Sequence, residues 1–397
     1  MERIYFDHAA TTPLDPAVWE AMRPYLAEVH GNPSSIYRSG REARRALDAA
    51  RDTVARALGA ASSREIVFTS GGSEAINLAL KGLAWAAGER RRHVVTSAVE
   101  HHAVLRAARF LERHGFAVTY VAPDAEGRID PDRVAAAITD ETLLVSVMHA
   151  NNETGVIAPI EAIAAAAKER GAYFHTDAVQ SVGTLPVNVN ALGCDLLSLS
   201  AHKFYGPKGV GVLYVRRGVP LEPLIHGGGQ EQERRAGTEN VAGIVGLARA
   251  LELALSDREA RVEYVAKLRE RLEEGLLRRI DGIRVNGAGA ARLPGHLNVS
   301  IEGIEGESLL LNLDMMGIEA SSGSACTSGS LEPSHVLLAM GRSRQEALGS
   351  VRFSLGKGNT AAEVDRVVDA VAQIVDRLRR KRYSILKGGS QGGKATS

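Results

Sequence analysis

The sequence has few cysteines and almost no imbalance of charge. Cys194 and Cys326 are the two cysteines among 397 residues. Two cysteines cannot build a disulfide framework, and a cytoplasmic setting would keep both reduced. The formal net charge is +1, so there is no electrostatic case for binding nucleic acid.

Long apolar runs are also missing. No stretch approaches the roughly 20 apolar residues that a membrane-spanning helix needs, and residues 1–7 lack the apolar core of a secretory signal. Hydrophobic residues make up 45% of the chain and charged residues 24%, as in ordinary globular proteins. The expected class is a cytoplasmic enzyme, long enough for two domains.

From residue 64 onward, apolar segments typical of buried strands alternate with helical patterns. The expected strands are 64–69, 93–97, 116–121, 142–148, 173–176, 196–200 and 210–215. This alternation predicts an α/β fold, in which a mostly parallel seven-stranded sheet is sandwiched by helices. Ligands bind such sheets at the carboxyl ends of the strands, and several polar segments of this chain fall there.

The pattern changes at about Ser256. A long charged helix is followed by shorter strands and helices, and a final helix is expected from Ala361 to about Arg379. We therefore predict a large domain over 15–255 and a smaller α+β domain from 1–14 and 256–387. Residues 388–397 are rich in glycine and serine and predict a disordered tail.

Lys203 is the first candidate for chemistry. It follows the apolar strand 196–200, and a lysine at the polar end of a buried strand is partly desolvated, which lowers its pKa. Such an amine can form a Schiff base with an aldehyde, and Ser200 and His202 could serve a phosphate. Together they indicate pyridoxal 5′-phosphate (PLP) on Lys203. The alternative, an exposed lysine at a strand end, is equally compatible with this segment alone.

Two further strand ends suit the same cofactor. Gly71-Gly72-Ser73 lies between a strand and a helix, where glycine allows close approach and the helix N-terminus favours a phosphate. Asp177 ends an apolar strand, so its carboxylate could pair with a protonated pyridine nitrogen, while Gln180 could reach the ring hydroxyl. An ordinary turn and a helix-capping aspartate are the alternatives.

Three loops carry weaker signals. His101 follows the strand 93–97 and could stack on a ring and move protons, or belong to a surface histidine pair. Asn152 could position a hydroxyl group of the cofactor, or simply form a turn. The loop 234–240, which contains Thr238, could contact a phosphate from a neighbouring subunit, or be a solvated charged loop.

Two C-terminal segments suit the substrate. Arg352 lies in a short apolar strand, and its guanidinium could bind a substrate carboxylate through two parallel hydrogen bonds, or an internal Asp or Glu. Cys326 lies among serine, glycine and alanine, where a reactive thiol would be accessible; an incidental exposed cysteine is the alternative. Cys194 lies at the entrance to an apolar strand, which is typical of a structural thiol.

Together these segments resemble the cysteine desulfurases of the NifS and IscS type, in the class V aminotransferase group of fold-type I PLP enzymes. The resemblance extends from residues 5–13 to about Arg379. Its most specific part is Ser321–Gly329 followed by Leu331–His335, which resembles the long cysteine loop of the group I enzymes. The sequence after about Tyr383 does not match the IscS branch, so the sulfur acceptor is not identified.

The resemblance implies a role for each matching residue. Lys203 would hold PLP, Asp177 would pair with the pyridine nitrogen, and His101 would stack on the ring. Gln180 and Asn152 would lie at the ring hydroxyl; Gly72, Ser73, Ser200 and His202 would hold the phosphate, together with Thr238 from the partner subunit of a homodimer. Arg352, Asn32 and Asn152 would bind the substrate.

The implied reaction removes sulfur from L-cysteine. Lys203 would take the Cα proton, the Cys326 thiolate would accept the sulfur as a persulfide, and alanine would be released. The sulfur acceptor would be an iron–sulfur scaffold or a tRNA-thiolation protein, with no direct nucleic-acid or membrane contact. One alternative is a selenocysteine lyase or another class V aminotransferase, neither of which needs Cys326. The other is a non-catalytic sulfur-trafficking scaffold, which would not need Lys203, Asp177 and His101 together.

Overall fold

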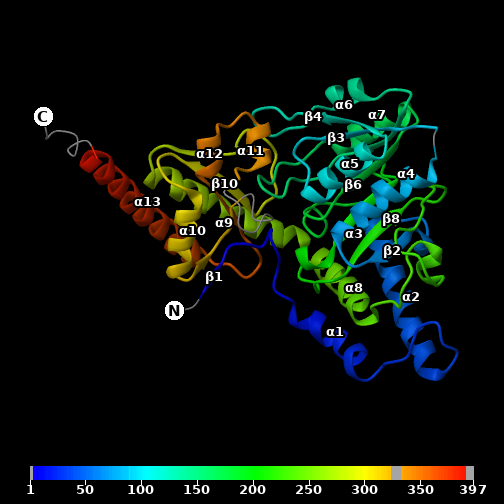
Figure 1. Cartoon of the computed structure of the whole chain (residues 1–397). Helices are drawn as coiled ribbons and strands as arrows, with labels where there is room; N and C mark the ends of the chain where they lie inside the picture. Colours follow the sequence, from blue (N-terminus) through cyan, green and yellow to red (C-terminus); the bar gives the residue numbers. More distant parts are fainter. Residues whose placement is uncertain (1–2, 89, 323–331, 390–397) are drawn as a thin grey trace, which may run out of the picture.

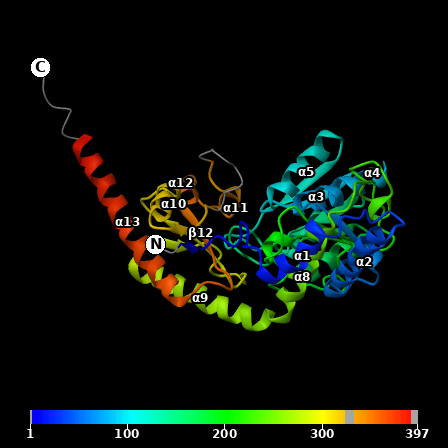
Figure 2. The same cartoon turned by 90° about the horizontal axis from the view of Figure 1, so that it is seen from below.

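The computed structural model describes residues 3–88, 90–322 and 332–389. Figure 1 shows a larger α/β part and a smaller α+β part side by side. Helix α8 (Val241–Ser256) packs in the larger part, and α9 (Arg258–Arg279) continues from it along the smaller part, as Figure 2 shows from below. The boundary predicted at residue 256 therefore falls between two consecutive helices, and the division into domains stays a prediction.

The larger part is built on a seven-stranded sheet. Its order is β2 (Ile66–Thr69), β8 (Gly211–Val215), β7 (Leu196–Ser200), β6 (Tyr173–Asp177), β5 (Thr142–Ser146), β3 (His93–Ser97) and β4 (Ala117–Val121). The strands from β7 to β4 are parallel, and β8 runs antiparallel to both of its neighbours. The predicted fold class, with a mostly parallel sheet, is confirmed.

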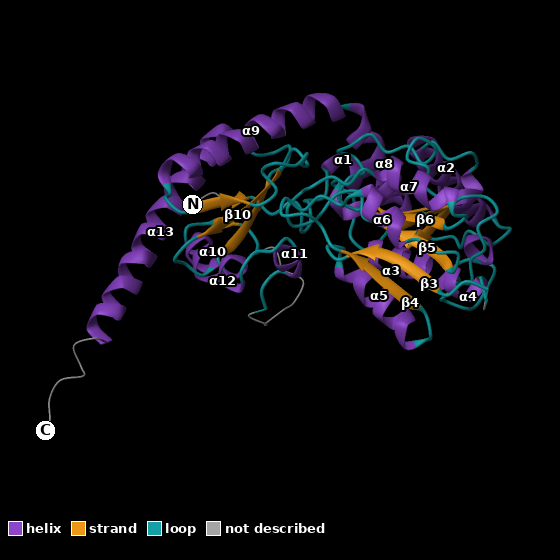
Figure 3. Ribbon diagram, turned by 90° about the horizontal axis from the view of Figure 1, so that it is seen from above, coloured by secondary structure: helices purple, strands orange, loops and turns teal. Residues whose placement is uncertain are grey.

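Consecutive residues of these strands enter two separate apolar cores, because side chains alternate between the faces of a sheet. Phe68 and Val95 belong to one core, and Val67 and Val94 to the other. The first core receives α1 (Pro16–Ala27), α2 (Arg38–Leu58), α6 (Pro131–Ala137), α7 (Ile160–Glu169) and α8; the second receives α3 (Gly72–Asn77), α4 (Leu83–Ala86) and α5 (His102–Arg113). Figure 3 shows the resulting layers on both sides of the sheet.

The smaller part contains an antiparallel sheet with one apolar and one polar face. Its order is β12 (Ser350–Ser354), β10 (His296–Ile301) and β9 (Ile283–Val285), and β1 (Ile4–Tyr5) pairs with β11 (Ile318–Glu319) beside it. Leu297 and Phe353 enter a core that includes residues of α9, α10 (Gly306–Met315) and α13 (Ala361–Gly389). The intervening polar residues Asn298 and Arg352 contact the backbone of residues 152–153, which follow β5. The polar face is therefore turned toward the larger part.

The last helix differs from its predicted length. Helix α13 continues to Gly389, ten residues beyond the predicted end at about Arg379, and projects away from the body of the protein in Figures 1 and 2. Residues 388 and 389, predicted as tail, are helical, and the rest of the predicted tail lies outside the described residues. Gly388 and Gly389, which belong to the segment predicted as a tail, are therefore still part of helix α13.

Across the part of the chain that the structure describes, no helix combines the length and apolar character needed to cross a membrane.

Candidate active site

The predicted strand ends meet at one edge of the large sheet. Lys203 lies in a single 3₁₀ turn, Ala201–Lys203, directly after β7, and Asp177 is the last residue of the neighbouring strand β6. The Lys203 ammonium donates hydrogen bonds to the carbonyl oxygens of Ala9 (2.6 Å) and Ala10 (2.8 Å). The N-terminal segment, far away in sequence, therefore forms one wall of this site.

The Asp177 carboxyl group is buried beside Lys203. Its Oδ1 accepts a hydrogen bond from the Val179 backbone N–H at 2.9 Å, so Asp177 caps a turn and not a helix, unlike the alternative interpretation. Burial raises the pKa of Asp177 to about 6, although the Val179 N–H and the positive charge of Lys203 oppose the rise. A cationic ring nitrogen at this place would stabilise the carboxylate, which these two contacts leave partly uncompensated.

Two of the predicted phosphate ligands, Gly72 and Ser200, come together where α3 begins. Gly72 packs so closely that a Cβ atom there would lie 2.8 Å from Val179 Cγ2 and 3.5 Å from the Ser200 Cβ. Gly71 before it has φ of 151°, a conformation that favours glycine. Ser73 is exposed next to this turn. The glycines thus leave room at the end of β7 that a larger residue would fill.

Two histidines of the site are neutral. Burial, followed by the charge of Lys203, lowers the pKa of both His101 and His202 to about 4. The His101 Nδ1 accepts a hydrogen bond from the Ala103 N–H at 3.1 Å and caps α5, so its proton is on Nε2. His202 Nδ1 lies 3.1 Å from the Thr11 hydroxyl. Neutral His101 can donate from Nε2 toward a ligand beside Lys203.

Gln180 lines the same space as Lys203, and Asn152 lies in the loop after strand β5. The Gln180 amide donates to the carbonyl of Ala9 at 3.0 Å, the same oxygen that Lys203 contacts. The Asn152 side-chain oxygen is buried and has no hydrogen-bond partner among the described residues. A buried acceptor of this kind is normally satisfied, so a hydroxyl or ammonium group of a ligand would complete it.

Arg352 has the internal partner that the alternative interpretation required. Its Nη2 donates to Oδ1 of Asp7 at 2.9 Å, and its Nη1 donates to the backbone oxygen of Asn152 at 2.7 Å. Its Nε is buried without a partner among the described residues. Arg352 is thus held against the loop that carries Asn152, and its binding of a substrate carboxylate stays a prediction.

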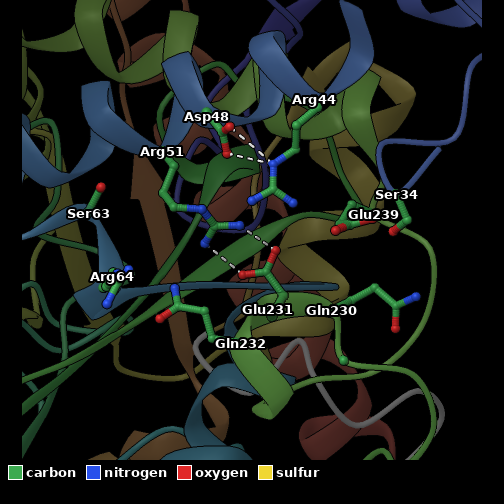
Figure 4. Close-up of a pocket in the computed structure, with 11 residues that line it drawn as sticks. Ser34, Arg44, Asp48, Arg51, Ser63, Arg64, Gln230, Glu231, Gln232 and Glu239 are labelled. Carbon is green, nitrogen blue, oxygen red and sulfur yellow. Dashed lines mark hydrogen bonds and ion pairs between the residues drawn. The ribbon is translucent and has the colours of Figure 1, made fainter. Parts of the chain in front are cut away.

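Two predicted site residues do not join this group. Asn32 and Thr238 are exposed. Their sequence neighbours Ser34 and Glu239 line a separate cavity of about 750 Å³, shown in Figure 4. Lys203 does not line this cavity. Within one chain, the segments of Asn32 and Thr238 therefore lie near each other. Arg235, three residues before Thr238, pairs with Glu74 of α3 at 2.9 Å, so the Thr238 segment also contacts the helix that begins at the predicted phosphate site.

A buried ion pair fixes the loop that leads to Thr238. In Figure 4, Glu231 accepts two hydrogen bonds from Arg51, at 2.6 and 2.7 Å, and it also accepts one from the Phe68 N–H at 2.9 Å. The backbone of residues 231–233 has positive φ values of 47°, 57° and 66°, although none of the three is glycine. Such backbone strain persists only where surrounding contacts hold it.

Cys326 lies outside the described residues, but the chain on both sides of residues 323–331 reaches the site. Ser321 donates to Asp7 Oδ2 at 3.1 Å. Beyond the gap, the Ser334 hydroxyl donates to the carboxylate of Glu153, and His335 Nε2 lies 3.0 Å from the Glu100 carbonyl oxygen. The other cysteine, Cys194, is fully buried, and burial raises its pKa.

Sequence analysis missed Asp7 and the backbone of Ala9 and Ala10 as parts of the site. An arginine in an apolar strand does signal a carboxylate partner. That signal could not identify Asp7, which is 345 residues away from Arg352 in sequence. Backbone carbonyls carry no sequence signal at all.

The donor set fits PLP. An amine, a buried carboxyl group short of positive partners and a glycine-lined turn lie at one edge of the large sheet. An unsatisfied amide oxygen, that of Asn152, lies in the loop after β5. The amine can bond to the aldehyde of the cofactor, and the carboxyl group can pair with its pyridine nitrogen. The amide oxygen can accept a hydrogen bond from its hydroxyl group, and the glycine-lined turn can take its phosphate.

Comparison with known proteins gives one consistent result. Residues 4–367 match the family model described as aminotransferase class-V. The chain is 52% identical over 376 residues to a protein named cysteine desulfurase IscS from Dictyoglomus turgidum, covering 95% of each chain. It is 53% identical over 376 residues to a protein of the same name from Methanosarcina thermophila, covering 95% of this chain and 93% of the relative.

Solved structures agree. A structure named NifS-like protein has a TM-score of 0.89 and 41% identity, and the match covers 94% of this chain and 99% of the other. A structure named SspA in complex with cysteine has a TM-score of 0.80 and 40% identity, with 90% and 100% of the two chains covered.

The raised pKa of Asp177 predicts that Asp177→Asn stabilises the cofactor-free protein at neutral pH. The favourable contribution of the neutral carboxyl is complete below pH 3.8 and is lost as the pH rises through about 6. The difference between a pKa of 3.8 and one of about 6 corresponds to a contribution to the free energy of unfolding of at most about 3 kcal/mol. Asparagine stays neutral and can still accept from Val179, so the variant should be more stable at pH 7 and equal near pH 4.

Urea unfolding at both pH values measures this difference. Asp140→Asn, at an exposed turn, is the matched control and should change stability by less than about 0.5 kcal/mol at either pH. An Asp177→Asn protein that is less stable than wild type at pH 7 would contradict the uncompensated burial of this carboxyl group.

Proposed function

Because the chain belongs to the class-V aminotransferase family and, within it, to the cysteine desulfurases of the NifS and IscS type, we propose that L-cysteine reacts beside Lys203 and that its sulfur passes to Cys326. The observation that carries the proposal is the placement of Lys203 and Asp177 at the ends of adjacent strands. The products are L-alanine and a persulfide on Cys326. An assay of alanine from L-cysteine, and of the sulfide set free when an added thiol reduces the persulfide, tests the reaction.

PLP is the proposed cofactor, bound to the Lys203 amine. The residues that would hold it are Asp177 at the ring nitrogen, His101 against the ring, Gln180 and Asn152 at the hydroxyl, and Gly72, Ser73, Ser200 and His202 at the phosphate. When bound, PLP supplies an electron sink that acidifies the substrate Cα–H and weakens the Cβ–S bond.

The protein surroundings prepare Lys203 for proton transfer. The amine must be neutral to take a proton from the substrate Cα. Once protonated, the ammonium can return to the carbonyl oxygens of Ala9 and Ala10, which it contacts in this structure. Neutral His101, with its proton on Nε2, would donate a hydrogen bond toward the reacting substrate.

Binding and sulfur transfer use the smaller part of the chain. Arg352 would bind the substrate carboxylate, with Asn152 beside it, since the two are joined by the Nη1 contact. The Cys326 thiolate would form an S–S bond to the substrate sulfur while the Cβ–S bond breaks, and protons delivered to Cβ and Cα complete L-alanine. Ser321 and Ser334, which flank the undescribed segment, contact this edge of the site and support the delivery of Cys326 there.

The proposal extends to the partners of the enzyme. A protein acceptor, such as an iron–sulfur scaffold or a tRNA-thiolation protein, would take the sulfur in the cytoplasm. A second copy of the chain would complete each site with Thr238, which is exposed in one chain. The Arg51–Glu231 pair would hold the Thr238 loop in position for this contact.

Lys203 should carry the cofactor. Borohydride reduction of the PLP-loaded protein fixes the linkage, and peptide mapping should find the pyridoxyl group on Lys203, because this amine lies between Asp177 and the α3 turn. Lys208, five residues away and exposed, serves as the internal control. Labelling on Lys208 instead would contradict the assignment.

Cys326→Ser should abolish alanine and sulfide release while leaving the visible absorption of bound PLP, because serine has nearly the same size but cannot hold a persulfide. Cys194→Ser is the matched control and should lower stability while the chemistry continues, since Cys194 is buried. Mass spectrometry of the wild type after brief exposure to L-cysteine should place the added sulfur on Cys326. Sulfur found on Cys194 alone would refute the mechanism.

Thr238 should act on the site of the partner copy. Lys203→Ala removes the amine, and Thr238→Glu places a negative charge next to a phosphate, so each variant alone should be inactive. Co-expressed, the two chains should regain part of the wild-type activity, because one site of the mixed dimer then has both wild-type residues. If Thr238 served its own chain, every mixed site would carry a defect and no activity would return.

A further inference from the structure

Asp7 links two functional segments through one carboxylate. Its Oδ1 accepts from Nη2 of Arg352 at 2.9 Å, and its Oδ2 accepts from the hydroxyl of Ser321 at 3.1 Å. Arg352 is the proposed ligand of the substrate carboxylate, and Ser321 precedes the segment that carries Cys326. Asp7 itself had no assigned role.

The backbone fixes the position of this carboxylate. Asp7 follows β1 and Ser321 follows β11, and these two strands are paired in parallel with Tyr5 opposite Glu319. Ser321 and Arg352 then exchange two backbone hydrogen bonds of 3.2 and 2.7 Å. Asp7 is therefore held against Arg352 by strand pairing on both sides rather than by a flexible side chain alone.

The Arg352–Asp7 pair is largely closed to water, with 4% and 17% of the two side chains exposed. A guanidinium binds a carboxylate most strongly through two parallel hydrogen bonds. Asp7 engages Nη2, while the adjacent Nε is buried and has no partner among the described residues. An incoming carboxylate could bind the Nε edge, but it would then lie next to the negative charge of Asp7.

We propose that Asp7 is a positioning residue that keeps Arg352 paired between turnovers and weakens the binding of carboxylates at Arg352. Both effects have a physical cause. A buried guanidinium left without a partner is strongly destabilising, and two carboxylates that share one cation repel each other.

Asp7 would therefore act on specificity. A ligand attached by its carboxylate alone binds weakly against the charge of Asp7. L-cysteine also has an amine that can join the cofactor, so it tolerates the repulsion. This inference rests on the proposed role of Arg352, and the test separates the two.

The test compares Asp7→Asn with wild type in the PLP-loaded enzyme. Asparagine keeps the shape and an acceptor for Arg352 but removes the charge. The probes are propionate and its neutral analogue propionamide, titrated by saturation-transfer NMR and as inhibitors against L-cysteine. Propionate should bind about tenfold more tightly to the variant, the effect of removing one nearby like charge, and propionamide should bind equally to both.

Three further variants make the outcome decisive. Ser321→Ala removes the contact to Oδ2 but keeps the Arg352–Asp7 pair, so its affinity for propionate should equal that of wild type. Asp7→Ser also removes the charge and should show the same gain in affinity for propionate. Either of these two variants decides the question, provided that its thermal unfolding is cooperative. Arg352→Lys should weaken the binding of propionate.

The failures are distinguishable. Equal or weaker binding of propionate to Asp7→Asn and Asp7→Ser would overturn the role of Asp7, since a merely structural pair would lose affinity when broken. If Arg352→Lys left propionate binding and the KM for L-cysteine unchanged, the proposed role of Arg352 would fail instead.

Discussion

The structure of the site depends on one buried charge, the guanidinium of Arg352. A buried cation in the middle of a strand has to be paired, and the partners of Arg352 come from distant parts of the chain. Asp7 lies near the N-terminus, and the backbone oxygen of Asn152 follows strand β5 of the large sheet. Satisfying this cation therefore joins the N-terminal segment, the smaller sheet and the larger sheet at the place where the substrate would bind.

Burial also sets the charge state of the surrounding groups. It raises the pKa of the Asp177 carboxyl to about 6, that of Glu153 to about 7 and that of Glu100 to about 8, and it lowers the pKa of His101 to about 4. Charged forms are disfavoured here because the low-polarity surroundings solvate them poorly. A site of this kind suits a ligand that brings its own charges, such as a ring cation and a phosphate, to groups already positioned for them.

The larger and smaller sheets use strand alternation differently. In the large sheet, consecutive residues such as Val67 and Phe68 enter two apolar cores, and the predicted site residues Asp177 and Ser200 end their strands. In β10 and β12 the second face is polar, so Asn298 and Arg352 are buried against the loop after β5. The same period of two thus produces two apolar faces in one part and, in the other, a polar face turned toward the larger part.

Much of the protein was determined by local sequence. The order of strands and helices, the positions of Lys203 and Asp177 at strand ends and the family resemblance all follow from short patterns, because periodicity and turn chemistry act over a few residues. Only the tertiary structure decided that Asp7 is the partner of Arg352 and that the carbonyls of Ala9 and Ala10 face the amine. These contacts join segments hundreds of residues apart, and packing rather than local pattern determines which of many equivalent carboxylates, loops or carbonyls arrives there.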